Sequence, residues 1–174
     1  MAEKVSLNEL NRSARDVFVR IVGPVFEHSP WIAETTFALK PFADFATLHY
    51  ALCDTVKNSG EEKQLALIRA HPDLVGRLAL SGQLTRESTG EQVSAGLDRL
   101  SPEEIALFQK NNAGYKDRFG FPFIICARLN KKEAILRGFE ARLKNSREKE
   151  ISMALAEIFK IAELRLRDLI LVEV

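Results

Sequence analysis

The sequence has few of the residues that mark several functional classes. It contains two cysteines, Cys53 and Cys126, and three histidines, His28, His49 and His71, among 174 residues. Two cysteines are too few for a disulfide-linked scaffold and fit a reducing cytosol. Since the histidines form no His-x-x-x-His pair, the sequence predicts no metal site.

An excess of charge of one sign is also lacking. Lys and Arg number 25 and Asp and Glu number 24, a formal net charge of +1. No basic excess is available to neutralise a phosphate backbone, so we expect no nucleic-acid partner. No apolar run approaches the ~18 residues of a membrane span, and residues 1–6 lack the layout of a signal peptide. Residues 171–174 carry no peroxisomal address, so we expect a cytoplasmic protein with no membrane partner.

Helical periodicity, interrupted by capping motifs, dominates what is present. The length and the 46% hydrophobic content suit one folded domain over residues 1–174. We expect an all-α bundle of about seven to nine helices with one short extended segment. The expected helices cover residues 7–21, a short segment from 31, 42–56, 61–70, 88–100, a segment from 102, 130–143 and 146–171, with a polar loop over 81–90.

One apolar stretch, residues 119–127, departs from the helical pattern. It contains Gly120 and Pro122 within a run of phenylalanine and isoleucine. Since no partner strand is visible elsewhere, we expect extended backbone between helices. Buried amides need hydrogen-bond partners, and a bound ligand could be one of them.

Arg165 is the most informative single residue. At roughly 100° per residue it lies about 20° from Ile158, within the apolar stripe of the last helix, whereas Arg167 lies about 180° away and faces solvent. A buried guanidinium stays charged and needs an anion or several acceptors. Two interpretations stay open. Arg165 either forms an ion pair with a core carboxylate or reaches the rim as a structural residue, or it binds an oxyanion of a ligand.

Two histidines differ in their settings. His71 ends a helix because the residue before Pro72 is pushed out of helical geometry. There it can act in acid–base chemistry or satisfy the carbonyls of the last turn. His49 lies on an apolar helix face between Phe45 and Leu52. We expect it to be a core residue with a satisfied ring.

A polar cluster, Ser88, Glu91 and Gln92, lies where the 81–90 loop meets a helix. Ser88 and Glu91 can form a capping box at the start of that helix. Alternatively, open amides beside a carboxylate and a carboxamide form a site for a polar or anionic small molecule. The sequence has no Gly-x-Ser-x-Gly elbow, Walker loop or dinucleotide fingerprint.

The ordered motifs resemble a known family. They are residues 26–31 (Phe-Glu-His-Ser-Pro-Trp), 67–74 (Leu-Ile-Arg-Ala-His-Pro-Asp-Leu), 88–92 (Ser-Thr-Gly-Glu-Gln) with 95–97, 115–123, and the last helix with Arg165. The set is similar to 2-oxo-4-hydroxy-4-carboxy-5-ureidoimidazoline (OHCU) decarboxylase, from about Leu7 to Leu169. His-Pro alone would be weak, but the ordered set is specific.

The resemblance implies an all-α, cofactor-free and usually homodimeric enzyme. Members convert OHCU to (S)-allantoin in urate degradation, with a conjugated ring that accepts the electrons left by CO2. By resemblance, His71, Glu91 and Arg165 are catalytic. The implied substrate contacts are Pro72, Ser88, Thr89, Gly90 and Gln92, with the segment Phe123, Ile124, Ile125, Cys126 and Ala127.

Three rival functions are weighed against this one. A helical interaction module explains the neutral charge but not Arg165 on a core stripe. A metal-dependent hydrolase of allantoin would be sensitive to a chelator. Hydroxyisourate hydrolase activity belongs to a small β-sandwich protein, and nothing in this sequence indicates such a fold.

Overall fold

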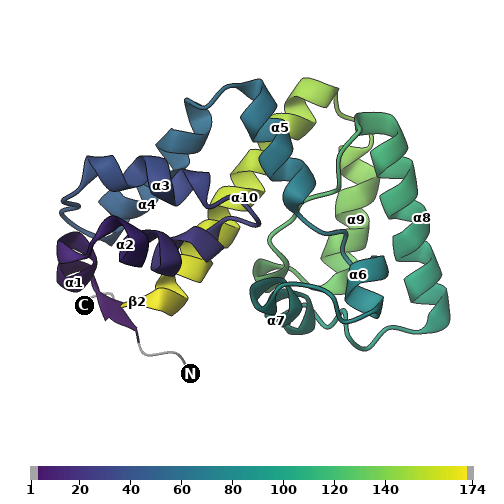
Figure 1. Cartoon of the computed structure of the whole chain (residues 1–174). Coiled ribbons are helices and arrows are strands. Elements are labelled where there is room, and N and C mark those ends of the chain that lie inside the picture. Colours follow the sequence, from purple (N-terminus) through teal and green to yellow (C-terminus); the bar gives the residue numbers. More distant parts are fainter. Residues whose placement is uncertain (1–3, 172–174) are drawn as a thin grey trace. The chain divides into compact units, whose positions relative to one another are not determined.

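The structure, a computed structural model, describes residues 4–171 apart from the side chains of Arg77 and Leu78. It is built mainly of helices, which confirms the all-α prediction (Figure 1). The helices are α1 (Leu7–Arg12), α2 (Arg15–Val22), α3 (Trp31–Thr36), α4 (Phe45–Lys57), α5 (Glu61–Ala70), α6 (Arg77–Leu80), α7 (Arg86–Ser94), α8 (Pro102–Phe119), α9 (Lys132–Arg142) and α10 (Arg147–Leu169). Short 3-10 turns cover Gly23–Val25, Phe37–Leu39 and Ala127–Leu129, and the strands are β1 (Val5–Ser6) and β2 (Ile170–Leu171).

The chain divides into two compact units. Unit 1 holds the residues up to Ala70 and those from Phe159 onward, and unit 2 holds His71–Ile158. Helix α10 contributes residues to both units. The single domain expected over residues 1–174 stays a prediction.

Unit 1 has an apolar core formed by α1–α5 and the second half of α10. Phe18 is fully buried, and its ring packs edge-on against Phe37 and stacked against Phe42. His49 also lies in this unit, and its Nε2 is 2.9 Å from the carbonyl oxygen of Phe159. The ring is therefore satisfied as expected, although His49 is half-buried and not a fully buried core residue.

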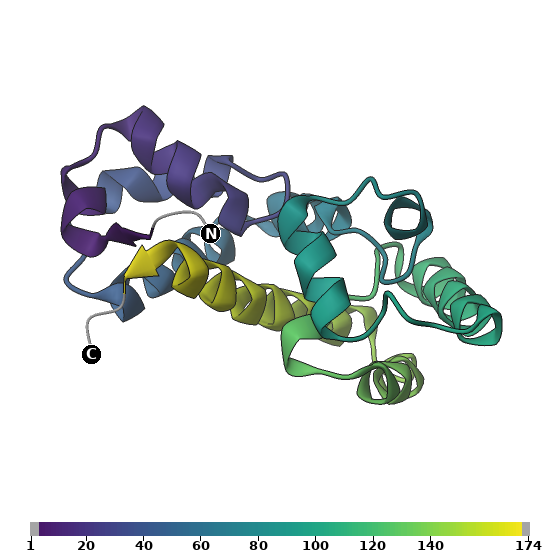
Figure 2. The ribbon, with the colours of Figure 1, turned by 90° about the horizontal axis from the view of Figure 1, so that it is seen from below.

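The two strands pair in parallel and bring the ends of the described chain together within unit 1. Val5 lies opposite Ile170 and Ser6 opposite Leu171, and the strand arrows lie side by side in Figures 1 and 2. The predicted last helix, 146–171, was therefore two residues too long. A strand of two residues leaves no alternating pattern in the sequence that could reveal it.

Unit 2 has an aromatic core around Tyr115. The Tyr115 ring centroid lies 4.6 Å from that of Phe119 and 5.2 Å from that of Phe123, and Phe123 stacks on Phe139 at 3.9 Å. Such ring pairs add stability beyond the area that they bury. This cluster anchors the apolar stretch that the sequence singled out.

Local capping chemistry explains several helix boundaries. Ser6 and Ser101 each form a reciprocal capping box, with Glu9 and Glu104, as expected from their Ser-x-x-Glu spacing. The bounds of α5 are those predicted. Gly120 ends α8 with a φ of 79°, a left-handed conformation that glycine adopts without strain.

Two further predicted helices differ more strongly from the structure, while the helix expected over 42–56 begins three residues later, at Phe45. The first breaks at Ser13 and Ala14, both extended, because the Ser13 hydroxyl donates to the Leu10 carbonyl and ends α1. The helix expected over 88–100 is α7, which starts at Arg86 and ends at Ser94. The first half of the predicted 81–90 loop follows α6, and its second half is helical.

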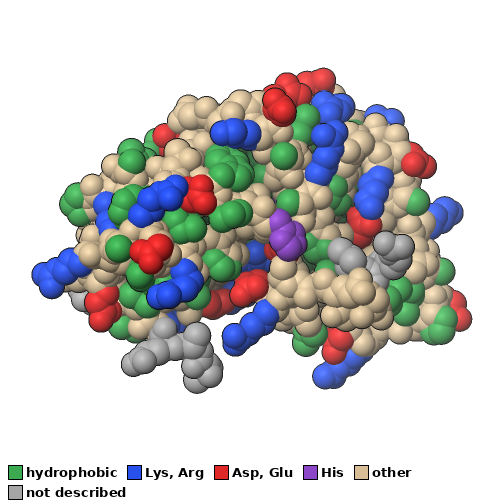
Figure 3. Space-filling view, in the orientation of Figure 1, with side chains coloured by type: hydrophobic (Ala, Val, Ile, Leu, Met, Phe, Trp, Pro, Cys, Tyr) green, Lys and Arg blue, Asp and Glu red, His purple; other side chains and the backbone are tan. Residues whose placement is uncertain are grey.

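The surface drawn in Figure 3 carries acidic and basic side chains interspersed with apolar ones, as the near-zero net charge predicts. Within residues 4–171, none of the helices combines the length and the apolar character needed to span a membrane.

Candidate active site

His71 lies directly after α5 and opens the loop that leads to α6. Its side chain is buried, with 8% exposed, although it follows the helix and does not lie on its apolar stripe. Pro72 enforces this geometry, since the residue before a proline is disfavoured in the helical conformation. The prediction that His71 stands at a helix end is confirmed.

Helix α7 carries the predicted polar cluster, but not as a capping box. Its N-cap is Thr85, whose hydroxyl oxygen accepts from the Ser88 amide at 3.2 Å. The predicted Ser88–Glu91 capping box is therefore wrong, because both residues lie inside the helix. Neither side chain is the N-cap of α7, which was the structural alternative for this pair.

The periodicity of α7 divides the predicted contact residues between two faces. Ser88, Glu91 and Gln92 are three and four residues apart and share one face, on which Ser88 and Gln92 are buried and Glu91 is half-buried. Thr89 and Gly90 are exposed. A ligand at the buried face would meet the first three side chains, and the contacts expected for Thr89 and Gly90 stay a prediction.

Gln92 fixes that face against the loop after His71. Its Oε1 accepts from the Val75 amide at 3.0 Å, and its Nε2 is 3.4 Å from the Asp73 carbonyl oxygen. The structure therefore brings Gln92 and residues 73–75, in the loop after His71, together within unit 2.

Two residues of α8 bind the same loop, and the sequence did not single out either of them as functional. Asn112 Nδ2 donates to the Leu74 carbonyl at 2.7 Å, and Lys116 Nζ lies 2.5 Å from Asp73 Oδ2. A signal for Asn112 was present: it is a polar residue four positions after Phe108, on the stripe that α8 buries.

The loop has an uncommon backbone. Val75 has a φ of 53°, which a β-branched residue rarely adopts. Gly76 follows it, and a Cβ there would lie 2.6 Å from Asp73 Cβ, too close for any other residue without movement. Strain of this kind persists only where the surroundings enforce it.

Residues 122–126 form neither helix nor strand, as predicted, whereas Phe119 still belongs to α8 and Ala127 begins a 3-10 turn, so the irregular stretch is shorter than the predicted 119–127. Side chains satisfy several of its backbone groups: Arg142 Nη1 donates to the Ile124 carbonyl, the Cys126 amide donates to Glu157 Oε2 at 2.8 Å, and Asn130 Nδ2 donates to the Cys126 carbonyl at 2.9 Å. Within residues 4–171, the backbone groups of Ile125 make no hydrogen bond. A ligand could bond these groups, and equally the backbone groups of Phe123 and the Ile124 amide, for which no hydrogen bond is present within the same residues.

The two cysteines are not suited to nucleophilic chemistry. Burial raises the pKa of the Cys53 thiol to about 12 and also raises that of Cys126. A thiol needs a lowered pKa to react as a thiolate near neutral pH. Cys126 can therefore contribute shape and backbone to a site but not a nucleophile.

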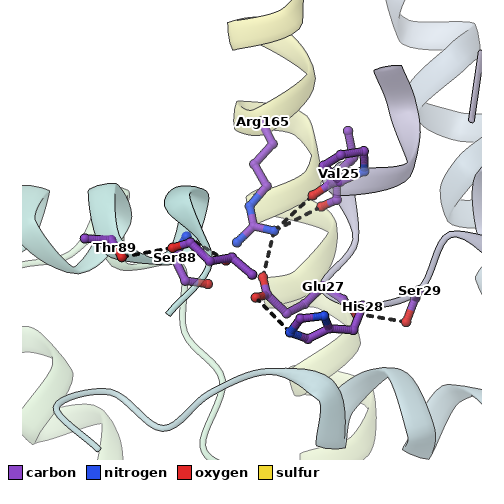
Figure 4. A network of polar contacts seen from close by, with 9 residues as sticks. Val25, Glu27, His28, Ser29, Ser88, Thr89 and Arg165 are labelled. Carbon is purple, nitrogen blue, oxygen red and sulfur yellow. Dashed lines mark hydrogen bonds and ion pairs between the residues drawn. The ribbon is translucent and has the colours of Figure 1, made fainter. Parts of the chain in front are cut away.

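Arg165, in unit 1, has the core carboxylate that one interpretation expected. Its Nη1 lies 3.0 Å from Glu27 Oε2, and both side chains are buried. The same nitrogen lies 3.3 Å from the Pro24 carbonyl oxygen and 3.5 Å from that of Val25 (Figure 4). The ion pair is thus confirmed, while binding of a ligand oxyanion by Arg165 stays a prediction.

Two charged or titratable side chains near this ion pair are exposed. His28 is 69% exposed, and its Nε2 lies 3.9 Å from Glu27 Oε1, beside Ser29 in Figure 4. Arg167 is 47% exposed and pairs with Glu163 at 2.7 Å, so the prediction that it faces solvent is confirmed. In the part of the chain that the structure describes, no three His, Cys, Asp or Glu side chains gather to hold a metal ion.

Comparisons with known proteins agree on one family. The model of a family described as OHCU decarboxylase matches residues 11–167. A 2-oxo-4-hydroxy-4-carboxy-5-ureidoimidazoline decarboxylase from Halalkalicoccus jeotgali is 42% identical, covering 95% of this chain and 92% of its own. A protein of the same name from Haloferax volcanii is 40% identical, covering 95% and 96%. A crystal structure of (S)-allantoin synthase matches with a TM-score of 0.74 and 26% identity over 94% of this chain, which spans 53% of that longer chain.

Proposed function

The chain belongs to the OHCU decarboxylase family, and from this we propose that it is a carboxy-lyase that converts OHCU to (S)-allantoin. The observation in the structure that best supports the proposal is in unit 2. Helix α7 presents Ser88, Glu91 and Gln92 on one face, and Gln92 bonds the loop that begins at His71.

The reaction needs few groups. The substrate carries a carboxylate and a hydroxyl on one ring carbon, and loss of CO2 leaves an electron pair that the conjugated ring accepts. The protein must orient the carboxylate and deliver a proton to one face of the ring. An imidazole can donate or accept a proton near neutral pH, and we assign this transfer to His71.

The remaining side chains would bind and orient the substrate. Glu91 would polarise the hydroxyl or hold the ureido group, and Ser88 would bond the ureido amide. Gln92 uses Oε1 on the Val75 amide, so the second hydrogen of its Nε2 is the group left for the ligand. The backbone of Ile125 would meet the ring.

Arg165 is assigned to catalysis by family resemblance. A guanidinium would neutralise an anionic oxygen of the substrate. We further propose that the protein acts without a cofactor, as a homodimer, in the cytoplasm. Sedimentation of the purified protein tests its oligomeric state.

One assay tests the activity. Freshly made OHCU is followed by circular dichroism with and without the protein, in the presence and absence of a chelator. We expect (S)-allantoin to form faster than the racemic product of the spontaneous reaction, and the chelator to have no effect. A racemic product at the uncatalysed rate would contradict the proposal, and loss of activity with chelator would favour a metal-dependent enzyme.

Three variants test the assigned residues. His71→Asn should fold and lose roughly 10²–10⁴-fold in turnover, the usual contribution of general acid–base transfer. Glu91→Ala should lose turnover with little change in melting temperature, and Ser88→Ala should lose less. Glu87→Ala is the matched control, because Glu87 is exposed on the same helix. Retention of more than about a tenth of wild-type turnover by His71→Asn would remove His71 from that role.

A further inference from the structure

We propose that Asn112 is a positioning residue for the reaction: its side-chain amide holds the Leu74 carbonyl and so fixes the loop that follows His71. The inference rests on the proposed function, in which His71 transfers the proton. Asn112 lies on α8 and acts through the loop of residues 72–76, which we call the His71 loop. It is not assigned any contact with the substrate.

The burial of Asn112 is the first observation that supports this role. It is 5% exposed and lies on the buried side of α8 between Phe108 and Tyr115, where an apolar side chain would pack without a desolvation cost. Its Nδ2 reaches the Leu74 carbonyl at 2.7 Å. Its Oδ1 is buried and, within residues 4–171, has no hydrogen-bond partner.

The Asn112 amide bonds one backbone group but leaves its own buried oxygen without a hydrogen bond, which destabilises the fold. An apolar side chain would fill the same space without that loss, so packing alone does not account for Asn112. Asp73 Oδ1 is a second buried oxygen without a partner in the described part of the chain, and it lies on the loop itself. Unsatisfied polar groups of this kind gather where geometry serves function at the expense of stability. The His71 loop and its support carry both of them.

The backbone of the loop explains why support is needed. Val75 is held at a φ of 53°, and Gly76 makes an approach to Asp73 that no side chain would allow. A left-handed valine relaxes unless its neighbours are fixed. Three successive residues are fixed, each by a different side chain: Lys116 holds Asp73, Asn112 holds Leu74 and Gln92 holds Val75.

Among these three contacts, water can replace only the one at the surface. Lys116 is 46% exposed, so loss of its ammonium leaves Asp73 Oδ2 near solvent. Asn112 and Gln92 are buried, so the bond to Leu74 has no substitute when Asn112 is removed. Relaxation of Val75 would then shift Pro72 and the His71 side chain, and misplacement by about 1 Å can lower a rate by about 100-fold.

The chain supplies a matched control. Asn111 is the same residue type on the same helix, one position away, and its side chain makes no hydrogen bond within residues 4–171. We compare Asn112→Ala and Asn112→Asp with Asn111→Ala and Asn111→Asp in the full chain. The readouts are kcat and KM for OHCU well below the melting temperature, and hydrogen exchange of the Val75 amide.

We expect Asn112→Ala to lower kcat by about 10–100-fold with KM nearly unchanged and to speed exchange at Val75, whereas the Asn111 variants match the wild type. Asn112→Asp gives a second signature. A carboxylate cannot donate to the Leu74 carbonyl, but its protonated form can. The activity of Asn112→Asp relative to Asn111→Asp should therefore rise as the pH falls, because both variants add one carboxylate to α8, near the titratable groups His71, Asp73 and Lys116, and only one of them faces the Leu74 carbonyl.

Each outcome bears on the idea. A folded Asn112→Ala variant with wild-type kcat and wild-type exchange at Val75 overturns it. If Asn112→Ala does not fold, the pH-dependent ratio for Asn112→Asp decides, and a flat ratio overturns it. If the wild type does not accelerate OHCU decay, the proposed function fails, while the exchange comparison between Asn112 and Asn111 still shows whether Asn112 holds the loop.

Discussion

Two buried arginine–glutamate pairs, one in each unit, look alike and differ in their surroundings. In unit 2, Arg142 Nε lies 2.8 Å from Glu150 Oε2, and the guanidinium lies 4.4 Å from the Phe123 ring centroid. In unit 1, Arg165 Nη1 lies 3.0 Å from Glu27 Oε2. Both arginines stand on core stripes: each is seven residues, or about 20° in projection, from a buried isoleucine, Ile135 or Ile158.

The difference lies in what else each carboxylate meets. Glu150 is fully buried and also accepts from the Tyr115 hydroxyl and from Asn145 Nδ2, so its charge is neutralised and solvated by core groups. Glu27 has the exposed His28 ring 3.9 Å from its Oε1. Position on an apolar stripe therefore predicts burial and an anionic partner, but it does not tell a structural arginine from a catalytic one.

The largest expected effect comes from cutting the pair in unit 2. Arg142→Met strands the Glu150 carboxylate in the aromatic core and frees the Ile124 carbonyl, so we expect a loss of about 3–5 kcal/mol in the free energy of unfolding. Urea denaturation measures it. Arg137→Met, on an exposed face of the same helix, should change stability by less than about 0.5 kcal/mol. A mild effect of Arg142→Met would show that Tyr115 and Asn145 suffice to solvate the carboxylate.

Cutting the pair in unit 1 should cost less. Arg165→Met strands Glu27, but the exposed His28 ring lies beside that carboxylate, so we expect a loss near the lower end of about 3–5 kcal/mol. The double variant Glu27→Gln with Arg165→Met should regain part of the stability, because no charge is then left unpaired. Additive losses in this double-mutant cycle would contradict the ion pair as a source of stability.

Removing one donor from Glu150 sharpens the contrast. Burial, followed by the hydrogen bond to Glu150, raises the pKa of Tyr115, so its hydroxyl keeps its proton and remains a donor. Tyr115→Phe should cost about 1.5–3 kcal/mol, as for other hydrogen bonds to charged groups. A raised pKa also predicts that the stability contributed by Tyr115 is complete below about pH 10 and is lost as the pH rises through the folded-state pKa. Alkaline unfolding curves of Tyr115→Phe should therefore lack that decline.

The substitution with the smallest expected effect on stability, Arg165→Lys, distinguishes a structural role of Arg165 from a catalytic one. Arg165→Lys keeps the charge beside Glu27, so we expect the free energy of unfolding to fall by only about 1 kcal/mol. Turnover should fall strongly, because an ammonium cannot reproduce a planar two-pronged contact with an oxyanion. Arg167→Lys, on the opposite side of the helix, should change neither property, since exposed pairs contribute little. Wild-type turnover in Arg165→Lys would leave Arg165 with a structural role alone.

The fold was predictable where local chemistry decides it. Capping boxes at Ser6 and Ser101, the Pro72 break and the apolar stripe of α10 all follow from neighbouring residues. The break at Ser13 and the start of α7 after its N-cap, Thr85, depend on which of several neighbouring polar side chains forms the cap, and the sequence alone does not decide this. On α9 the buried residues are Ile135, Phe139 and Arg142, and burial of an arginine there depends on its pairing with Glu150 from another helix.

The candidate site was predictable only in part. His71 at a helix end and a polar face on α7 follow from spacing and from the resemblance. The support of the His71 loop by Asn112 joins residues 38 positions apart, and nothing local to either residue encodes that contact. The same holds for Glu27, whose pairing with Arg165 depends on how α10 packs in unit 1.

The discontinuity of unit 1 has a consequence for how the protein is made. Its residues come from both ends of the chain, with the whole of unit 2 between them. At a synthesis rate of about 5–20 residues per second, an interval on the order of 10 s separates the synthesis of helix α5 from that of the second half of α10. During that interval Glu27 has no Arg165 to pair with and β1 has no β2. Nascent unit 1 is thus the part of the chain that would depend on a chaperone, whereas unit 2 emerges as one uninterrupted segment.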